Sequence, residues 1–98
     1  MLMMEVDGYS YNQKLQRVFF ENNEIELGPK ALKLIKLLCE NRNITLEIDE
    51  IIEALWDEPK SKQTLRSLIH RIRQMTSSEL IQNINKFGYK IGLNRNPL

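Results

Sequence analysis

The chain has 98 residues, of which 42% are apolar and 28% charged, and its net charge at pH 7 is +1. This length accommodates one small domain, and the composition is that of a folded soluble protein rather than a disordered one. No apolar run reaches the ~20 residues of a membrane span, no signal peptide opens the chain, and one cysteine with one histidine excludes disulfides and transition-metal sites. We therefore expect a cytoplasmic protein without membrane contact.

The near-neutral total hides a strong asymmetry of charge along the chain. Residues 1–59 carry six bases and twelve acids, a net charge of −6. Residues 60–98 carry eight bases and one acid, a net charge of +7. A basic C-terminal part indicates an anionic partner, although solvated basic helices are also common.

The first third of the chain predicts a small antiparallel sheet of three strands. Tyr9–Asn12, Arg17–Phe20 and Glu24–Leu27 are rich in aromatic and branched residues, which favour extended structure. The polar run Glu21–Asn23 supplies a turn between the last two strands.

The first helix is predicted over Pro29–Asn41. Gly28 followed by Pro29 is a helix start, because proline at the first helical position loses no hydrogen bond there. One face collects the apolar residues Ala31, Leu34, Ile35, Leu38 and Cys39. Cys39 is therefore interpreted as a core residue rather than a reactive thiol.

A short strand, Ile44–Leu46, and a second helix, Ile48–Asp57, are predicted next. The helix has an apolar face and an outer face of carboxylates, which we interpret as solvated surface. Trp56 falls on the apolar side and is expected to be a core anchor between helices. Pro59 ends this segment, so 57–60 forms a tight connection.

The third helix, Ser61–Met75, is the most informative segment. Its N-cap is Ser61, and its apolar stripe comprises Leu65, Leu68, Ile69, Ile72 and Met75. The remaining arc is basic and polar, with no acid between Pro59 and Ser78. Exposed helices usually mix both signs of charge, so these unopposed cations point to a bound anion.

A terminal hairpin follows, with strands at Leu80–Ile84 and Tyr89–Leu93. Gly88 is expected to supply the unusual backbone angles of its turn, and the polar tail 94–98 is expected to fray. The order of elements is that of an α+β winged helix-turn-helix: an N-terminal antiparallel sheet, three helices, and a C-terminal β-hairpin wing. In such a fold the third helix enters the major groove of DNA.

Signs of catalysis are absent. The four glycines are isolated from one another, so no phosphate-binding loop is present. The sole His70 lies in a basic helix, where no carboxylate would orient it as a base. We expect neither an enzyme nor a cofactor.

The motifs in this order resemble the winged-helix effector domain of OmpR/PhoB-type response regulators. The resemblance runs from about Tyr9 to Leu93. It rests on four short segments, Leu27-Gly28-Pro29-Lys30-Ala31, Ile51-Ile52-Glu53-Ala54-Leu55-Trp56, Ile69-His70-Arg71-Ile72-Arg73 and Gly88-Tyr89. It implies one DNA-binding domain, 1–98, with an ordered core at about 9–93 and with the usual receiver domain absent. An excised effector domain is favoured over a stand-alone regulator, because the chain starts just before the first strand.

The resemblance also implies which residues contact double-stranded DNA. Arg71 matches a base- or phosphate-contacting arginine, Arg66 replaces a usual aspartate, and Lys86 is the substitute for a missing minor-groove arginine. The expected contacts are Lys62, Gln63, Thr64, Arg66, Ser67, His70, Arg71, Arg73, Asn85 and Lys86.

Further partners follow only from the family. Its members contact RNA polymerase through the loop that corresponds to Asp57–Lys60, and a dimer on tandem half-sites is left open. The alternative function is a winged-helix interaction module that binds RNA polymerase or an acidic partner without reading bases. The acid-free third helix favours DNA over this alternative.

Overall fold

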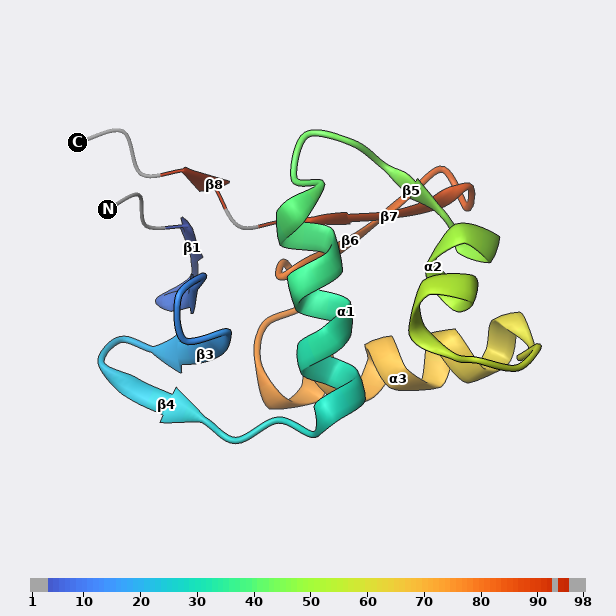
Figure 1. The fold of residues 1–98 in the computed structure, drawn as a ribbon. Helices are drawn as coiled ribbons and strands as arrows, with labels where there is room; N and C mark the ends of the chain where they lie inside the picture. Colours follow the sequence, from blue (N-terminus) through green and yellow to red (C-terminus); the bar gives the residue numbers. More distant parts are fainter. Residues whose placement is uncertain (1–3, 93, 96–98) are drawn as a thin grey trace.

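Three helices and two antiparallel sheets make up the computed structural model, which describes residues 4–92 and 94–95 (Figure 1). The helices are α1 (Pro29–Glu40), α2 (Ile48–Leu55) and α3 (Lys62–Met75). The N-terminal sheet has the order β4-β3-β2-β1-β8, with β1 (Met4–Val6), β2 (Tyr9–Asn12), β3 (Arg17–Phe20), β4 (Asn23–Ile25) and β8 (Asn94–Arg95). The second sheet has the order β5-β7-β6, with β5 (Leu46–Glu47), β6 (Ile81–Ile84) and β7 (Gly88–Ile91). Within the described ranges no helix has the length and apolar character needed to cross a bilayer.

The N-terminal sheet is larger than the sequence predicted. The expected strands β2 and β3 are confirmed, and β4 begins one residue earlier and ends two residues earlier than expected. Two strands, β1 and β8, were not predicted. Strand β1 pairs with β2 on one side and with β8 on the other. The expectation of a frayed tail is therefore wrong for Asn94 and Arg95, because the β1 backbone supplies their ladder partners; residues 96–98 lie outside the described part.

Helix α1 begins where the local signals place it. Gly28 is the N-cap with an extended backbone, and Pro29 is the first helical residue. The five residues of the predicted apolar face are all buried. Cys39 is fully buried, and this burial raises the pKa of its thiol to about 12. A thiol that stays protonated is a packing group, which confirms the expected role.

Helix α2 is two residues shorter than expected. Its first turn is closed by the Glu47 N–H, which donates to Glu50 Oε1 at 3.0 Å. It ends at Leu55, and the next residue has an extended backbone. The short strand before it is shifted from the prediction, because Leu46 and Glu47 are the residues that pair with β7, while Ile44 remains 57% exposed.

Trp56 is not the buried anchor that its position in the sequence suggested. Because α2 ends at Leu55, Trp56 lies outside the helix and packs only partly against the core. Lys30 covers it from α1: Lys30 Nζ lies 5.6 Å from the ring centroid and donates to the Leu55 carbonyl at 2.6 Å. Met75, the last residue of the apolar stripe predicted for α3, is also not buried, because 50% of its surface is exposed.

Replacing Trp56 by alanine is expected to lower the free energy of unfolding by about 2 kcal/mol. This lies below the ~3–5 kcal/mol of a fully buried aromatic, since part of the ring already faces water. Urea unfolding monitored by far-UV circular dichroism measures the change. Tryptophan fluorescence cannot serve as the probe, because the variant lacks the chain's single tryptophan. Trp56→Phe is the matched control and should lose less than half as much. A loss above about 4 kcal/mol would restore the fully buried interpretation.

The wing differs from the prediction in the role of its glycine. The residues with left-handed backbone angles are Asn85 (φ 50°) and Lys86 (φ 60°), not Gly88. Gly88 is instead needed for close packing in the middle of the sheet. A Cβ atom built there would lie 1.9 Å from the Leu46 carbonyl oxygen of β5, so only a residue without a side chain lets β5 and β7 approach.

Candidate nucleic-acid interface

Helix α3 is capped at its N-terminus, and its apolar face packs against the core. The Ser61 Oγ accepts a hydrogen bond from the Thr64 N–H at 3.2 Å, and the two hydroxyls lie 3.1 Å apart. Leu65, Leu68, Ile69 and Ile72 are buried. The helix therefore turns its opposite face outward, and Thr64, which is half-buried, takes part in the cap rather than standing free.

The outward face of α3 carries most of the predicted contact residues. Its exposed side chains are Lys62, Gln63, Arg66, Ser67, His70 and Arg71. Gln63 Nε2 donates to Ser67 Oγ at 3.4 Å, which ties two of the polar groups together. In the described ranges the ion pairs are Arg17–Glu24 and Lys60–Glu58, so the cations of this face have no acidic partner there. Their charge is available to an anion from outside.

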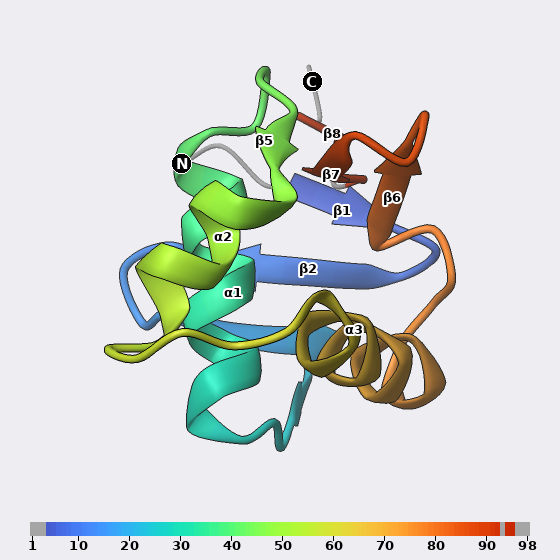
Figure 2. The same ribbon diagram turned by 90° about the vertical axis from the view of Figure 1, so that its right-hand side faces the viewer.

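The wing lies beside this face and forms a shared hollow with it. In Figure 2, α3 and β6 lie on the same side of the molecule, and the turn after β6 projects beyond the strand. A hollow of about 540 Å³ separates them, and the residues of α3 that line it are Gln63, Arg66, Ser67, Ile69, His70, Arg71 and Arg73. Asn83 and Tyr89 close it on the wing side. Asn85 and Lys86 are exposed at the end of the wing.

Arg73 differs from the other basic residues of α3. It is half-buried, and its Nε and Nη2 atoms both donate to the Ile81 carbonyl of β6, at 3.2 and 2.6 Å. The guanidinium thus spans from the helix to the first wing strand. Its contact within the protein fixes the position of the wing relative to α3.

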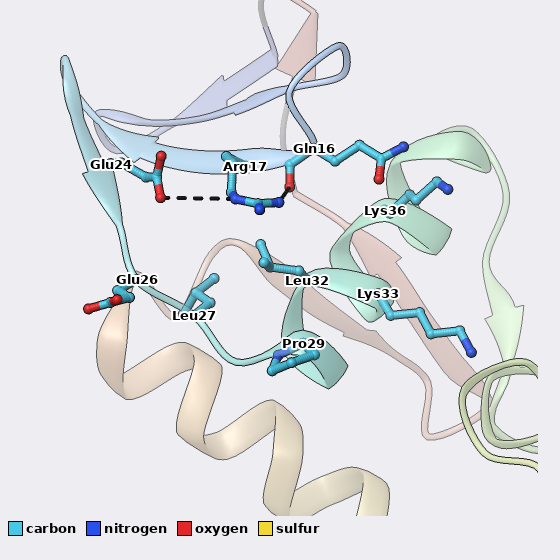
Figure 3. A pocket seen from close by; sticks show the side chains of 9 residues that line it. All are labelled: Gln16, Arg17, Glu24, Glu26, Leu27, Pro29, Leu32, Lys33 and Lys36. Atoms are coloured by element: carbon cyan, nitrogen blue, oxygen red, sulfur yellow. Dashed lines mark hydrogen bonds and ion pairs between the residues drawn. The ribbon is translucent and has the colours of Figure 1, made fainter.

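A second hollow, of about 550 Å³, lies between the N-terminal sheet and α1 (Figure 3). Basic and acidic groups both line it, and Arg17 is held by Glu24 at 4.0 Å and by the Gln16 carbonyl at 3.0 Å. Lys33 and Lys36 approach from α1. Three basic side chains and two acidic ones line this hollow, so its charges are mixed, unlike those of the outward face of α3.

The connection between α2 and α3 forms a third hollow, of about 450 Å³, beside Trp56. Acidic residues of α2 and of the loop line it together with Lys60. Lys60 Nζ lies 2.9 Å from Glu58 Oε1, and this hydrogen-bonded lysine lowers the pKa of the Glu58 carboxyl. The expected polymerase loop, Asp57–Lys60, is therefore exposed but carries charges of both signs.

Nowhere in residues 4–92 and 94–95 do three histidine, cysteine or acidic side chains gather closely enough to hold an ion.

Two wing residues near the site were missed by sequence reasoning. Asn83 lines the hollow, and its Oδ1 accepts a hydrogen bond from the Lys86 N–H at 3.0 Å. Phe87 is 53% exposed at the wing turn. An asparagine two residues before a pair of left-handed residues is a recognisable turn signal, whereas the exposure of Phe87 depends on its neighbours in space.

The three-helix core, the terminal hairpin and the basic third helix beside it define a winged helix-turn-helix domain. A family model described as the C-terminal domain of transcriptional regulatory proteins matches residues 22–91, and the chain belongs to that family. The expected membership in the OmpR/PhoB-type effector domains is thereby confirmed.

Curated relatives agree with this assignment. The transcriptional regulatory protein QseB of Haemophilus influenzae is 29% identical over 92 residues, which cover 92% of this chain and 42% of QseB. The response regulator ArlR of Staphylococcus aureus is 23% identical over 95 residues, which cover 91% of this chain and 43% of ArlR. The chain thus spans less than half the length of these relatives.

Solved structures share the fold. The Thermotoga maritima response regulator DrrB, an OmpR/PhoB homologue, aligns with a TM-score of 0.78 and 21% identity over 91% of this chain and 43% of DrrB. The DNA-binding domain of Bacillus subtilis CssR aligns with a TM-score of 0.71 and 23% identity over 85% of this chain and 98% of its own. The AdeR DNA-binding domain in complex with an intercistronic region aligns with a TM-score of 0.73 and 12% identity. The alignment covers 89% of this chain and 96% of the AdeR chain. The predicted winged-helix fold is confirmed.

Proposed function

We propose that this domain binds double-stranded DNA with base preference and regulates transcription, as the effector part of a two-component response regulator. The observation that carries the proposal is the outward face of α3, whose exposed cations have no acidic partner among the described residues. An α-helix fits the major groove, where arginine donates two hydrogen bonds to guanine. That a fold neighbour, AdeR, was solved in complex with an intercistronic region supports this use of the fold.

The contact residues divide into three roles in this proposal. Arg71, exposed in the C-terminal half of α3, reads a base, and Lys62, Arg66 and Lys86 neutralise phosphates. The remaining exposed polar side chains of the expected set, Gln63, Ser67, His70 and Asn85, make shorter contacts. Thr64 and Arg73 take part in the helix cap and the wing attachment, so they position the surface rather than contact DNA.

Two further partners belong to the same proposal. RNA polymerase is proposed to contact the loop Asp57–Lys60, which lies at a different hollow from the one shared by α3 and the wing. Two domains are proposed to pair on tandem half-sites. Neither contact is required for a single domain to recognise DNA.

Selection of bound duplexes from a random pool tests the proposal. We expect an enriched motif, and a repeated motif would reveal two domains on one site. If no motif is enriched but a generic duplex binds, the domain does not read bases; if no duplex binds, it is not a DNA-binding domain.

Arg71→Ala is expected to weaken binding to the enriched duplex about tenfold and to change non-specific binding much less. The reason is that a bidentate contact to guanine contributes about 1–3 kcal/mol of discrimination. Fluorescence anisotropy on the enriched and a scrambled duplex measures both affinities. Equal losses on the two duplexes would show that Arg71 contacts a phosphate.

A further inference from the structure

The side chain of Gln63 lies at the centre of the outward face of α3. Gln63 is exposed, and it lies roughly half a turn around the helix from the buried Leu65 and Ile72. Its side chain therefore points away from the core, toward a molecule that approaches this face. Gln63 also lines the hollow that α3 shares with the wing.

A neighbouring hydroxyl orients the Gln63 amide. Gln63 Nε2 donates to Ser67 Oγ at 3.4 Å, and Ser67 lies one turn further along the same face. An amide group has two N–H donors and one oxygen acceptor. Ser67 uses one donor, and among the described residues the amide has no other hydrogen bond. One N–H and the Oε1 atom therefore remain available, side by side, to a ligand.

The backbone that carries this amide is fixed as well. Gln63 is the second residue of α3, inside the turn that Ser61 closes. The Thr64 N–H donates to Ser61 Oγ at 3.2 Å. Cap and amide are thus ordered before any ligand arrives, which lowers the entropy cost of binding.

The free donor and acceptor of Gln63 match one base edge. In the major groove adenine presents the N7 acceptor beside the N6 donor, and glutamine pairs with both at once. Guanine presents two acceptors there, N7 and O6, and O6 would face the amide oxygen of Gln63. The amide therefore distinguishes adenine from guanine.

We propose that Gln63 is a specificity-determining residue that selects an adenine in the DNA site, and that Ser67 is its positioning residue. This inference rests on the proposed function and adds to it the identity of one base. The enriched motif is expected to contain one A·T pair at which the preference depends on Gln63.

The test changes that pair in the enriched duplex, with affinities measured by anisotropy at one salt concentration. The pair is located as the position at which selection with Gln63→Ala no longer enriches adenine. Exchanging it for G·C should weaken binding of the wild-type domain about tenfold. 7-Deazaadenine keeps the pairing with thymine but lacks the N7 acceptor, so it should weaken binding about fivefold.

Variants assign this preference to the Gln63 amide. Gln63→Ala should bind all three duplexes within about twofold of one another. Gln63→Arg should prefer G·C at the same pair, because arginine donates to both O6 and N7. Ser67→Ala should reduce the wild-type preference to about threefold, and Ser67→Thr should retain it because the hydroxyl is kept. In the Gln63→Ala background, Ser67→Ala should change nothing at this pair.

Gln74→Ala is the matched control. Gln74 is an exposed glutamine of the same helix that does not line the hollow, so this variant should keep the full preference for adenine. Thermal melting checks that each variant is folded.

The outcomes separate this inference from the proposed function. Adenine selection by Gln63 is refuted, while DNA binding stands, if Gln63→Ala enriches the same motif as the wild type or if 7-deazaadenine binds as well as adenine. An unchanged preference in Ser67→Ala refutes the positioning role of Ser67. If the wild-type domain binds no duplex, the proposed function and this inference both fail.

Discussion

Gly88→Ala is expected to lower the free energy of unfolding by about 3 kcal/mol, the upper part of the range for overpacking a tightly packed site. The added Cβ would lie 1.9 Å from the Leu46 carbonyl oxygen and 2.7 Å from its carbon. Both are backbone atoms, so no side-chain rotation relieves the clash. Strand β5 must therefore separate from β7, which breaks the Leu46–Tyr89 and Glu47–Gly88 pairings.

Chemical denaturation and thermal melting measure this effect. For a domain of this size, 3 kcal/mol corresponds to a fall in Tm of roughly 12–24 °C. Gly28→Ala is the matched control: nothing lies within 4 Å of a Cβ at that position, and the loss of a good N-cap residue costs at most about 1 kcal/mol. If Gly88→Ala and Gly28→Ala have the same Tm, β5 is not packed against β7 at Gly88.

Affinity for DNA is expected to fall about fortyfold between 50 and 200 mM monovalent salt. Counterion release gives a slope of about −0.9 in log affinity against log salt for each neutralised phosphate. With Lys62, Arg66 and Lys86 on phosphates, the slope is about −2.7 per domain. The Arg73 guanidinium is held by the Ile81 carbonyl, so we do not assign it a phosphate.

Single lysine variants test which face produces this slope. Lys86→Ala should make the slope shallower by about 0.9 and weaken all duplexes alike, because a lysine is a point charge with little base discrimination. Lys33→Ala should leave the slope unchanged, since Lys33 lines the hollow between α1 and the N-terminal sheet (Figure 3). Equal effects of the two variants would place the DNA-binding face elsewhere.

Local features of the chain were enough to predict the three helices and the order of the elements apart from strands β1 and β8. Proline after Gly28 and serine at position 61 are start signals that act within one turn of helix, and the apolar residues of α1 recur at helical spacing. The charge difference between the two parts of the chain is likewise a property of composition. Part of the excess of basic residues lies on α3, whose outward cations have no acidic partner in the described ranges.

Contacts between distant segments were decided only by the tertiary structure. Gly88 is required because Leu46 passes within van der Waals distance of it, and no pattern around either residue reveals this approach. Arg73 has the same local setting as Arg66 and Arg71, but it is the one that meets the Ile81 carbonyl of β6. The pairing of β8 with β1 and the partial exposure of Trp56 have the same origin. Capping and periodicity act over about four residues along the chain, whereas strand pairing and side-chain exposure depend on which remote backbone comes to lie beside a residue.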